Sequence, residues 1–345
     1  MGRLPQPAST ANPERSWTLC KMKTDISLWF GVAAVLLCGL AGQARGETIA
    51  VITDLNGSYG STRYHARVDA AVAAIVELQP DVVLSAGDMV AGQRQPLLSR
   101  EQVRAMWASF HQHVTDPLAA AGIPLAVTPG NHDGSAYPVF AAEREIFVDE
   151  WSTRRPAVEF VAADSYPLNY AVAVGKVLII GLDVTTVSPL PMAQREFLEA
   201  VLAAHGERFD TRIVFCHLPL WPFAQGRETE ILRDSRLAQQ LAAHDVAMLV
   251  SGHHHVFYPG IDDNGVLHVS AGVLGGNIRR FSGSDIKSEF SFVLIEIDNG
   301  VVSVSARAAP DFERQIDSGR LPRQIAGPDG ELQRYEPGAV ARSAR

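Results

Sequence analysis

Five short apolar runs in this chain each end in residue types that bind metal ions in proteins. They are followed by Asp54, by Asp88, by the stretch 129–133 (Pro-Gly-Asn-His-Asp), by His217, and by His253 with His255. In open α/β sheets, ligands bind beyond the carboxyl ends of the strands, where side chains from several strands meet. One such loop alone is explained equally well by an Asx turn, but five in one chain predict a shared site at one edge of a sheet.

The order of apolar runs along the chain predicts an α/β fold. Apolar residues at helical spacing predict helices over 64–78, 100–121, 137–153, 191–205 and 229–243. Strands are expected over 48–52, 82–85, 123–128, 212–216, 246–251 and 266–271, with hairpins over 169–183 and 290–307. Strands that alternate with helices imply a parallel sheet with right-handed crossovers, and the strand-rich second half implies a mixed sheet. We therefore expect two packed mixed β-sheets flanked by helices.

The first 46 residues differ from the rest and resemble a secretory signal peptide. Two lysines precede the apolar run 26–40, and small residues follow it up to Gly46. Residues 1–21 are too polar for the start of such a peptide, so translation is expected to begin at Met22. The run is short for a membrane span, although an uncleaved anchor is the alternative. A periplasmic or secreted protein is expected, and no stable membrane insertion of the mature chain.

The mature chain is expected to be one domain over 47–310, followed by a surface-hugging or mobile tail over 311–345, which is poor in large apolar residues. The sequence carries 30 Lys and Arg against 38 Asp and Glu. Loss of the leader removes more basic than acidic residues, so the balance argues against duplex nucleic acid as a partner.

Cys216 is then the one cysteine left, which excludes an intrachain disulfide and is typical of a small buried side chain.

The ordered series of polar motifs resembles the calcineurin-like metallophosphoesterase family, in its exported bacterial form. The motifs are Asp54-Leu55-Asn56, Gly87-Asp88, Gly130-Asn131-His132-Asp133, His217 and Gly252-His253-His254-His255. Each motif is weak alone, but the series spans most of the mature chain in the family's order. The resemblance implies a four-layer αββα sandwich in which two packed sheets carry helices on their outer faces.

The resemblance also implies a pair of divalent cations, Mn, Fe or Zn, bridged by Asp88. One cation would take Asp54, Asp88 and His255 with Asn56 nearby; the other would take Asp88, Asn131, His217 and His253. Two cations about 3.5–4 Å apart can hold both the attacking and the leaving oxygen of a phosphoryl centre. By the same resemblance a hydroxide between the metals attacks, His132 assists the leaving oxygen, and Asp133 orients His132. Side chains at i and i+2 share a face, so His254 is expected to point away.

Two positions depart from the family pattern. Asn56 stands where the first motif has histidine, and an amide oxygen is usually a weaker ligand than imidazole. The first metal site is therefore expected to be weak or partly filled. Ala91 stands where the family often has an aspartate that acts outside the ligand shell, so a smaller effect is expected there.

These residues favour an exported metal-dependent phosphoesterase that hydrolyses a small phosphomonoester or phosphodiester. The alternative is a catalytically silent binding or scaffold protein on the same fold, which the loss of the first histidine motivates. A serine or thiol hydrolase lacks any nucleophile-elbow pattern in this chain. Tyr59, in a Gly-rich loop near the expected site, is a candidate for stacking on a substrate, although packing explains it equally well.

Overall fold

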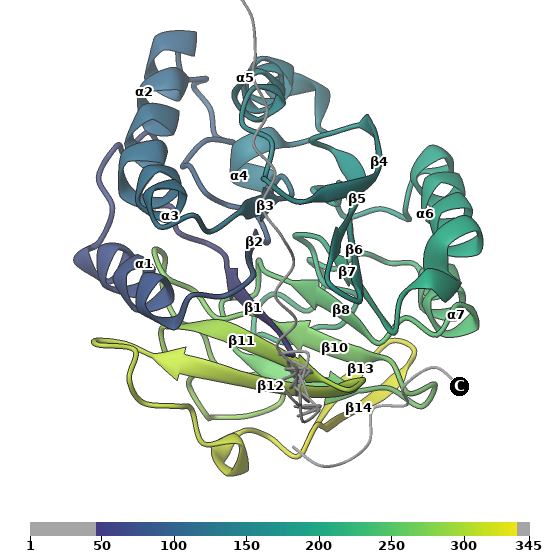
Figure 1. Cartoon of the computed structure of the whole chain (residues 1–345). Coiled ribbons are helices and arrows are strands. Elements are labelled where there is room, and N and C mark those ends of the chain that lie inside the picture. The colour runs from purple at the N-terminus through teal and green to yellow at the C-terminus, as the bar shows by residue number, and fades with distance from the viewer. Residues whose placement is uncertain (1–45, 337–345) are drawn as a thin grey trace, which may run out of the picture. The chain divides into compact units, whose positions relative to one another are not determined.

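Two β-sheets organise the part of the chain that this computed structural model describes, residues 46–336 (Figure 1). The smaller sheet has five strands in the order β12-β11-β1-β2-β3. Their bounds are β1 Glu47–Ile52, β2 Val82–Ser85, β3 Leu125–Val127, β11 Ser291–Asp298 and β12 Val301–Ala308. β1, β2 and β3 run parallel to one another, and β11 and β12 are antiparallel to their neighbours, so the sheet is mixed as expected.

The larger sheet has nine strands in the order β13-β14-β9-β10-β8-β7-β6-β5-β4. The bounds are β4 Glu159–Ser165, β5 Asn169–Val174, β6 Val177–Gly181, β7 Thr211–Phe215, β8 Met248–Ser251, β9 Tyr258–Ile261, β10 Leu267–Ser270, β13 Gln324–Gly327 and β14 Gly330–Arg334. Its centre, β6, β7, β8 and β10, is parallel, and both flanks are antiparallel. The predicted hairpin β5–β6 is present, whereas β4 and β9 were not predicted.

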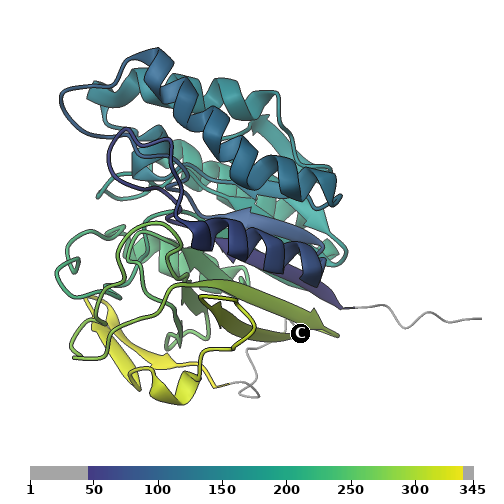
Figure 2. The same cartoon turned by 90° about the vertical axis from the view of Figure 1, so that its left-hand side faces the viewer.

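Alternation along β1 explains how the two sheets stack. Ile49 and Val51 point into a core shared with the larger sheet, whereas Ala50 and Ile52 belong to a second core, against helices. Those helices are α1 Ala66–Leu78, α2 Arg100–Phe110, α3 Asp116–Ala120 and α5 Ala141–Ser152. In Figure 1, α1, α2 and α3 lie on the left and α5 lies at the top; α1 and α2 face the viewer in Figure 2.

The outer face of the larger sheet carries the other two long helices. These are α6 Met192–His205 and α7 Ser235–Ala243, on the right of Figure 1. Leu198, Val201, Leu237 and Leu241 are their buried residues in the shared core. The order of layers is therefore helices, five-stranded sheet, nine-stranded sheet, helices, which confirms the predicted αββα sandwich.

One predicted helix has the expected extent but is irregular, and another begins later than expected. The helix expected over 100–121 is interrupted by a π-helical turn, His111–Thr115, followed by Pro117, whose nitrogen has no proton to donate to the preceding turn. The helix expected over 229–243 begins only at Ser235, because the Asp234 side chain accepts hydrogen bonds from Arg236 N and Leu237 N and caps the helix there. Residues 229–234 form a loop instead.

Part of the segment expected to be a tail belongs to the larger sheet. β13 and β14 form a hairpin, and β14 pairs with β9 through Gln333 and Arg334. Leu332 on β14 is fully buried in the shared core. The expected leader over 1–46 falls, except for Gly46, outside the described residues, as do residues 337–345. Across residues 46–336, no helix is both long and apolar enough to span a bilayer.

Replacing Leu332 with alanine tests whether the hairpin stabilises the sandwich. We expect Leu332→Ala to lower the free energy of unfolding by about 2–4 kcal/mol, the usual cost of removing a buried leucine side chain. Urea unfolding followed by fluorescence measures the change, with exposed Glu331→Ala on the same strand as control. Equal stability of the two variants would show that the hairpin is peripheral.

Candidate metal centre

Strand ends from both sheets place the predicted ligands in one site. Asp54, Asp88 and Asn131 follow β1, β2 and β3, and His217 and His253 follow β7 and β8. Hydrogen bonds continue the ladders past the strand ends: Asp54 N donates to Gly87 O at 3.0 Å, and Gly252 N donates to His217 O at 3.0 Å. Neighbouring loops are therefore hydrogen-bonded to each other, as the strands that precede them are.

Four of the predicted ligands have left-handed backbone. The φ angles are 52° for Asp54, 56° for Asp88, 66° for His253 and 57° for His255. Non-glycine residues adopt this region rarely and at a cost of order 1–3 kcal/mol each. Such a residue turns the chain sharply at the strand end, and strain of this kind clusters at functional sites in proteins.

Two glycines of the motifs leave room for ligands from other strands. A Cβ on Gly130 would lie 2.2 Å from Asp88 Oδ1, and a Cβ on Gly252 would lie 2.1 Å from Thr53 Oγ1. No side chain fits at either distance. Glycine is required here because each of these loops passes directly over the polar groups of a neighbouring loop.

The ring of His217 is oriented for binding a cation. Its Nδ1 lies 2.7 Å from Ala86 O, and because a carbonyl oxygen only accepts, Nδ1 carries the proton. Nε2 then faces two oxygens, Asn131 Oδ1 at 3.0 Å and Asp88 Oδ2 at 3.3 Å. Burial alone would lower the pKa of His217, but the Asp88 carboxylate raises it to about 9. Either a proton or a metal ion must stand between these atoms.

His255 repeats the arrangement on the other side of the site. Its Nδ1 lies 2.8 Å from Asn277 O, and its Nε2 lies 3.0 Å from Asp54 Oδ1. Asp54 Oδ1 is buried and accepts no hydrogen bond from residues 46–336. Burial would raise the pKa of Asp54, but the nearby His255 holds it well below its usual range. A buried carboxylate oxygen and an imidazole nitrogen that face each other are suited to bind the same metal ion.

The ligand atoms of Asp88, His217 and His253 lie within 4.8 Å of one another. Asp54 joins this cluster to His255, because its Oδ2 accepts a hydrogen bond from His253 N at 2.9 Å. Asn56 lines the same pocket with its Nδ2 donating to Val90 O at 3.3 Å, which leaves Oδ1 unused. The structure thus brings all seven predicted metal ligands together.

His132 lies at the pocket, whereas Asp133 does not. His132 Nδ1 is 2.7 Å from Gly92 O, and Nε2 is 4.0 Å from Asp88 Oδ2. Asp133 was expected to orient His132, but its carboxylate instead accepts hydrogen bonds from Val90 N and Gly130 N, both at 2.8 Å. Burial and the Asp88 charge raise the pKa of Asp133 to about 7. Asp133 therefore links the loop at Val90 to the loop at Gly130. The ring of His132 is oriented by its hydrogen bond to Gly92 O instead.

Sequence reasoning missed Glu230. His253 Nε2 lies 3.1 Å from Glu230 Oε2, which leaves Nδ1 of that ring for a metal ion. Carboxylates that hold the far nitrogen of a ligating histidine fix its orientation and raise its basicity. The hydrogen bond to His253 is the main reason that the pKa of Glu230 falls to about 2. No motif marks Glu230, and we had placed it inside a helix.

Gln93 was missed as well. Its Oε1 accepts a hydrogen bond from Asn131 Nδ2, so Asn131 Oδ1 is turned towards His217. Gln93 N donates to Glu143 Oε2 at 2.8 Å, which fixes the loop. His254 was correctly predicted to point away: it is buried, and its Nδ1 accepts a hydrogen bond from Phe223 N at 3.0 Å.

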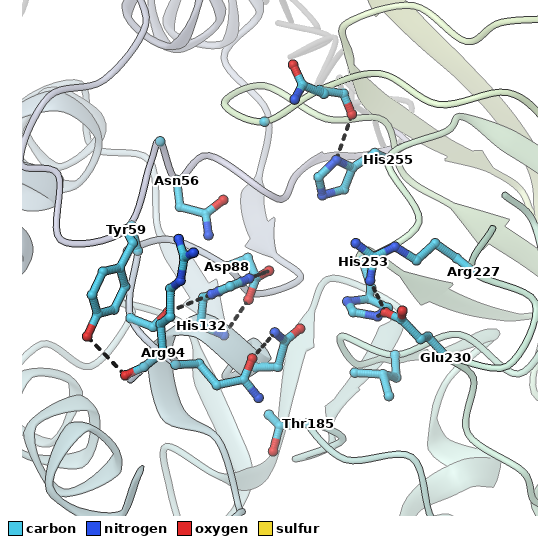
Figure 3. Close-up of a pocket in the computed structure, with 18 of the residues that line it drawn as sticks. Asn56, Tyr59, Asp88, Arg94, His132, Thr185, Arg227, Glu230, His253 and His255 are labelled. Carbon is cyan, nitrogen blue, oxygen red and sulfur yellow. Dashed lines mark hydrogen bonds and ion pairs between the residues drawn. The ribbon is translucent and has the colours of Figure 1, made fainter. Parts of the chain in front are cut away.

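The site opens into a pocket of about 770 Å³. Figure 3 shows Tyr59, Arg94 and His132 on one side of it and Arg227, Glu230 and His253 on the opposite side. The volume lies within the range of about 300–1,000 Å³ found for small-molecule sites. Carboxylates, imidazoles and an amide that converge on a pocket of this size define the class of dimetal hydrolases.

The chain belongs to the calcineurin-like phosphoesterase family, whose sequence profile matches residues 47–257. Its members hydrolyse phosphoester bonds with two metal ions, so the chain is a dimetal phosphoesterase. The comparison with curated proteins gave no match.

Solved structures agree with this fold. A dimetal phosphatase from Danio rerio has 14% identity and a TM-score of 0.55, over 79% of this chain and 98% of its own. A purple acid phosphatase from yellow lupin (Lupinus luteus) seeds has 16% identity and a TM-score of 0.58, over 77% of this chain and 52% of its own. PhoD has 10% identity and a TM-score of 0.58, over 86% of this chain and 73% of its own.

Replacing Glu230 with glutamine tests its hold on His253. We expect Glu230→Gln to weaken the binding of Mn²⁺ about 10–100-fold, the usual cost of losing such an outer partner. Titration against a metal indicator measures the affinity. Glu228→Gln is the matched control, because Glu228 is exposed and contacts only Gly226 N among the described residues. Unchanged affinity in Glu230→Gln would rule out this function.

Proposed function

We propose that this chain is an exported phosphoesterase that hydrolyses a small phosphomonoester or phosphodiester by direct attack of water, without a phosphoenzyme. The observation that carries the proposal is the pair of rings, His217 and His255. Each has Nδ1 bound to a carbonyl oxygen and Nε2 facing a carboxylate oxygen of Asp88 or Asp54. A metal ion at each contact would satisfy both the imidazole nitrogen and the carboxylate oxygen at neutral pH.

The residues divide into two ligand sets around Asp88. Asp54, Asn56 and His255 would complete one set, and Asn131, His217 and His253 the other. Two divalent cations, Mn, Fe or Zn, would polarise the phosphate and lower the pKa of the attacking water. The imidazole and amide ligands add no negative charge, which favours an anionic substrate.

His132 is the residue that we expect to protonate the leaving oxygen. Its Nδ1 donates to Gly92 O, so Nε2 carries a proton only when the ring is the imidazolium. Nε2 lies on the pocket side of the ring, 4.0 Å from Asp88 Oδ2. The side chain is 39% exposed in the pocket, so a leaving group can reach it. Asp133 supports this role indirectly, because it ties the loop that carries His132 to Val90.

Export rests on the leader-like sequence over 1–46, which lies almost wholly outside the described residues. A protein that reaches the periplasm or the medium meets phosphate esters from outside the cytoplasm, such as scavenged nucleotides or lipid headgroups. The net acidic charge favours small esters over duplex nucleic acid.

Loss of Asp88 or His217 tests the proposed centre. We expect Asp88→Asn and His217→Ala each to lower kcat/KM for p-nitrophenyl phosphate and its bis-ester at least about 100-fold, because even outer-shell changes cost 10–100-fold. The assay follows stripping and re-addition of Mn²⁺, Fe²⁺ or Zn²⁺. Asp164→Asn, exposed on β4, is the control. Full metal-dependent activity in both site variants would contradict the proposal.

The presence of Asn56 in place of the first motif's histidine favours the alternative function, a catalytically silent binding or scaffold protein. Its amide is held by Val90 O and offers one weak oxygen ligand. We expect Asn56→His to raise the metal bound per chain towards two and to increase turnover several-fold, because imidazole is the stronger ligand. Elemental analysis after metal-supplemented purification measures the content. Near-zero metal in both wild type and Asn56→His would favour the scaffold.

A further inference from the structure

Three arginines line the pocket, and two of them are already engaged. Arg227 forms an ion pair with Glu230, and Arg279 Nη1 donates to His253 O at 2.7 Å. Both therefore support His253, one through its hydrogen-bonded carboxylate and one through its backbone. Their positive charge helps to hold the centre itself.

Arg94 is the third, and its guanidinium has no carboxylate partner among residues 46–336. Its one described side-chain contact is with the ring of Tyr59, whose centroid lies 5.9 Å from the guanidinium carbon. The side chain is exposed, yet it lines the pocket that holds Asp88 and His132. An unpaired cation in a metal-site pocket attracts a further anionic group.

The backbone around Arg94 is fixed. Tyr59 Oη donates to Arg94 O at 3.0 Å, and Gly60 N donates to Ala91 O at 2.9 Å. On the other side, Gln93 N is held by Glu143 Oε2. Two loops and a helix therefore brace this turn. A guanidinium on a braced turn loses less freedom when it binds a ligand than one on a free loop does.

The pocket has room and an apolar surface beside this cation. Its volume of about 770 Å³ far exceeds what a lone phosphate needs. Tyr137 and Val187 line it with 44% and 39% of their surface exposed, which suits the carbon skeleton of a ligand. The lining thus combines the metal-ligand cluster, a carbon-binding surface and a separate cation.

We propose that Arg94, braced beside Tyr59, binds a second anionic group of the substrate. The preferred substrate is then an organic phosphate ester that carries a further phosphate or carboxylate outside the scissile group. A guanidinium suits either, because its fork of N–H donors matches the two oxygens of a carboxylate or phosphate. Arg94 lies on the same side as His132 (Figure 3), so the second anion belongs to the leaving part. This inference rests on the proposed function.

Binding of uncleavable analogues to the full chain loaded with Mn²⁺ tests the inference. The probes are propane-1,3-diphosphonate and 4-phosphonobutyrate, which carry a second anion, and propylphosphonate, which does not. Wild type is expected to bind the first two about tenfold or more tightly than propylphosphonate by calorimetry, the effect of one charge-assisted hydrogen-bonded contact. Their relative affinities distinguish a second phosphate from a carboxylate.

In Arg94→Gln, we expect this ratio of affinities to fall to about one. Arg63→Gln is the matched control and keeps the wild-type ratio, because Arg63 also lacks a carboxylate partner in residues 46–336 but does not line the pocket. Equal affinities in wild type, or a preference that survives Arg94→Gln, would overturn the inference.

Turnover of p-nitrophenyl phosphate by the same preparations decides the proposed function separately. If wild type hydrolyses p-nitrophenyl phosphate but binds the three phosphonates with equal affinity, only the Arg94 subsite would be overturned. Absent turnover of this ester and of its bis-ester, with an Arg94-dependent preference, would overturn the hydrolytic function and leave the anion subsite. Failure to bind any of the three phosphonates would overturn both.

Discussion

The contact between the loops that follow β1 and β2 is the one on which the rest of the centre depends. Leu55 N and Asn56 N both donate to Asp88 O, at 2.9 and 3.2 Å, and Asp54 N donates to Gly87 O. These bonds prolong a parallel strand pair beyond its regular end, so two carboxylates enter the site at a fixed separation. The loop that carries Gly252 then packs directly over Thr53, so it is positioned by the first two.

Burying carboxylates and imidazoles together at these strand ends costs electrostatic free energy. Asp54, Asp88 and His217 are all almost completely buried, and a buried charge is tolerated only when it is paired. Here the pairing is mutual: Asp88 raises the pKa of His217, while His217 and His132 lower that of Asp88 against the effect of burial. Left-handed backbone at four of the predicted ligands adds strain. Strained backbone and buried charges of this kind persist only where the surrounding structure holds them in place.

Sequence patterns predicted the layers, and the position of the candidate ligands at one sheet edge, because both depend on local rules. Apolar runs such as 82–85 must be buried strands, and the residue after each run lies at the sheet edge. Glu230 and Gln93 escaped because their roles depend on contacts with His253 and Asn131, 23 and 38 positions away. The late start of the helix expected over 229–243 had a visible cause, the capping side chain of Asp234 at its N-terminus. The apolar periodicity extends upstream of Asp234, and the prediction followed this periodicity and not the capping residue.

The two departures from the family pattern change the same wall of the pocket. Asn56 and Ala91 lie on the loops after β1 and β2, and both line the pocket beside Arg94. Ala91 stands where the pattern that the sequence resembles has an aspartate, and it is buried, with its carbonyl oxygen accepting a hydrogen bond from Gly60 N. Without that carboxylate, nothing in the adjoining loop neutralises Arg94. Asn56 in place of histidine removes a strong metal ligand from this wall. In the proposed subsite, the two changes together would favour the binding of anions over that of metal ions on this side of the pocket.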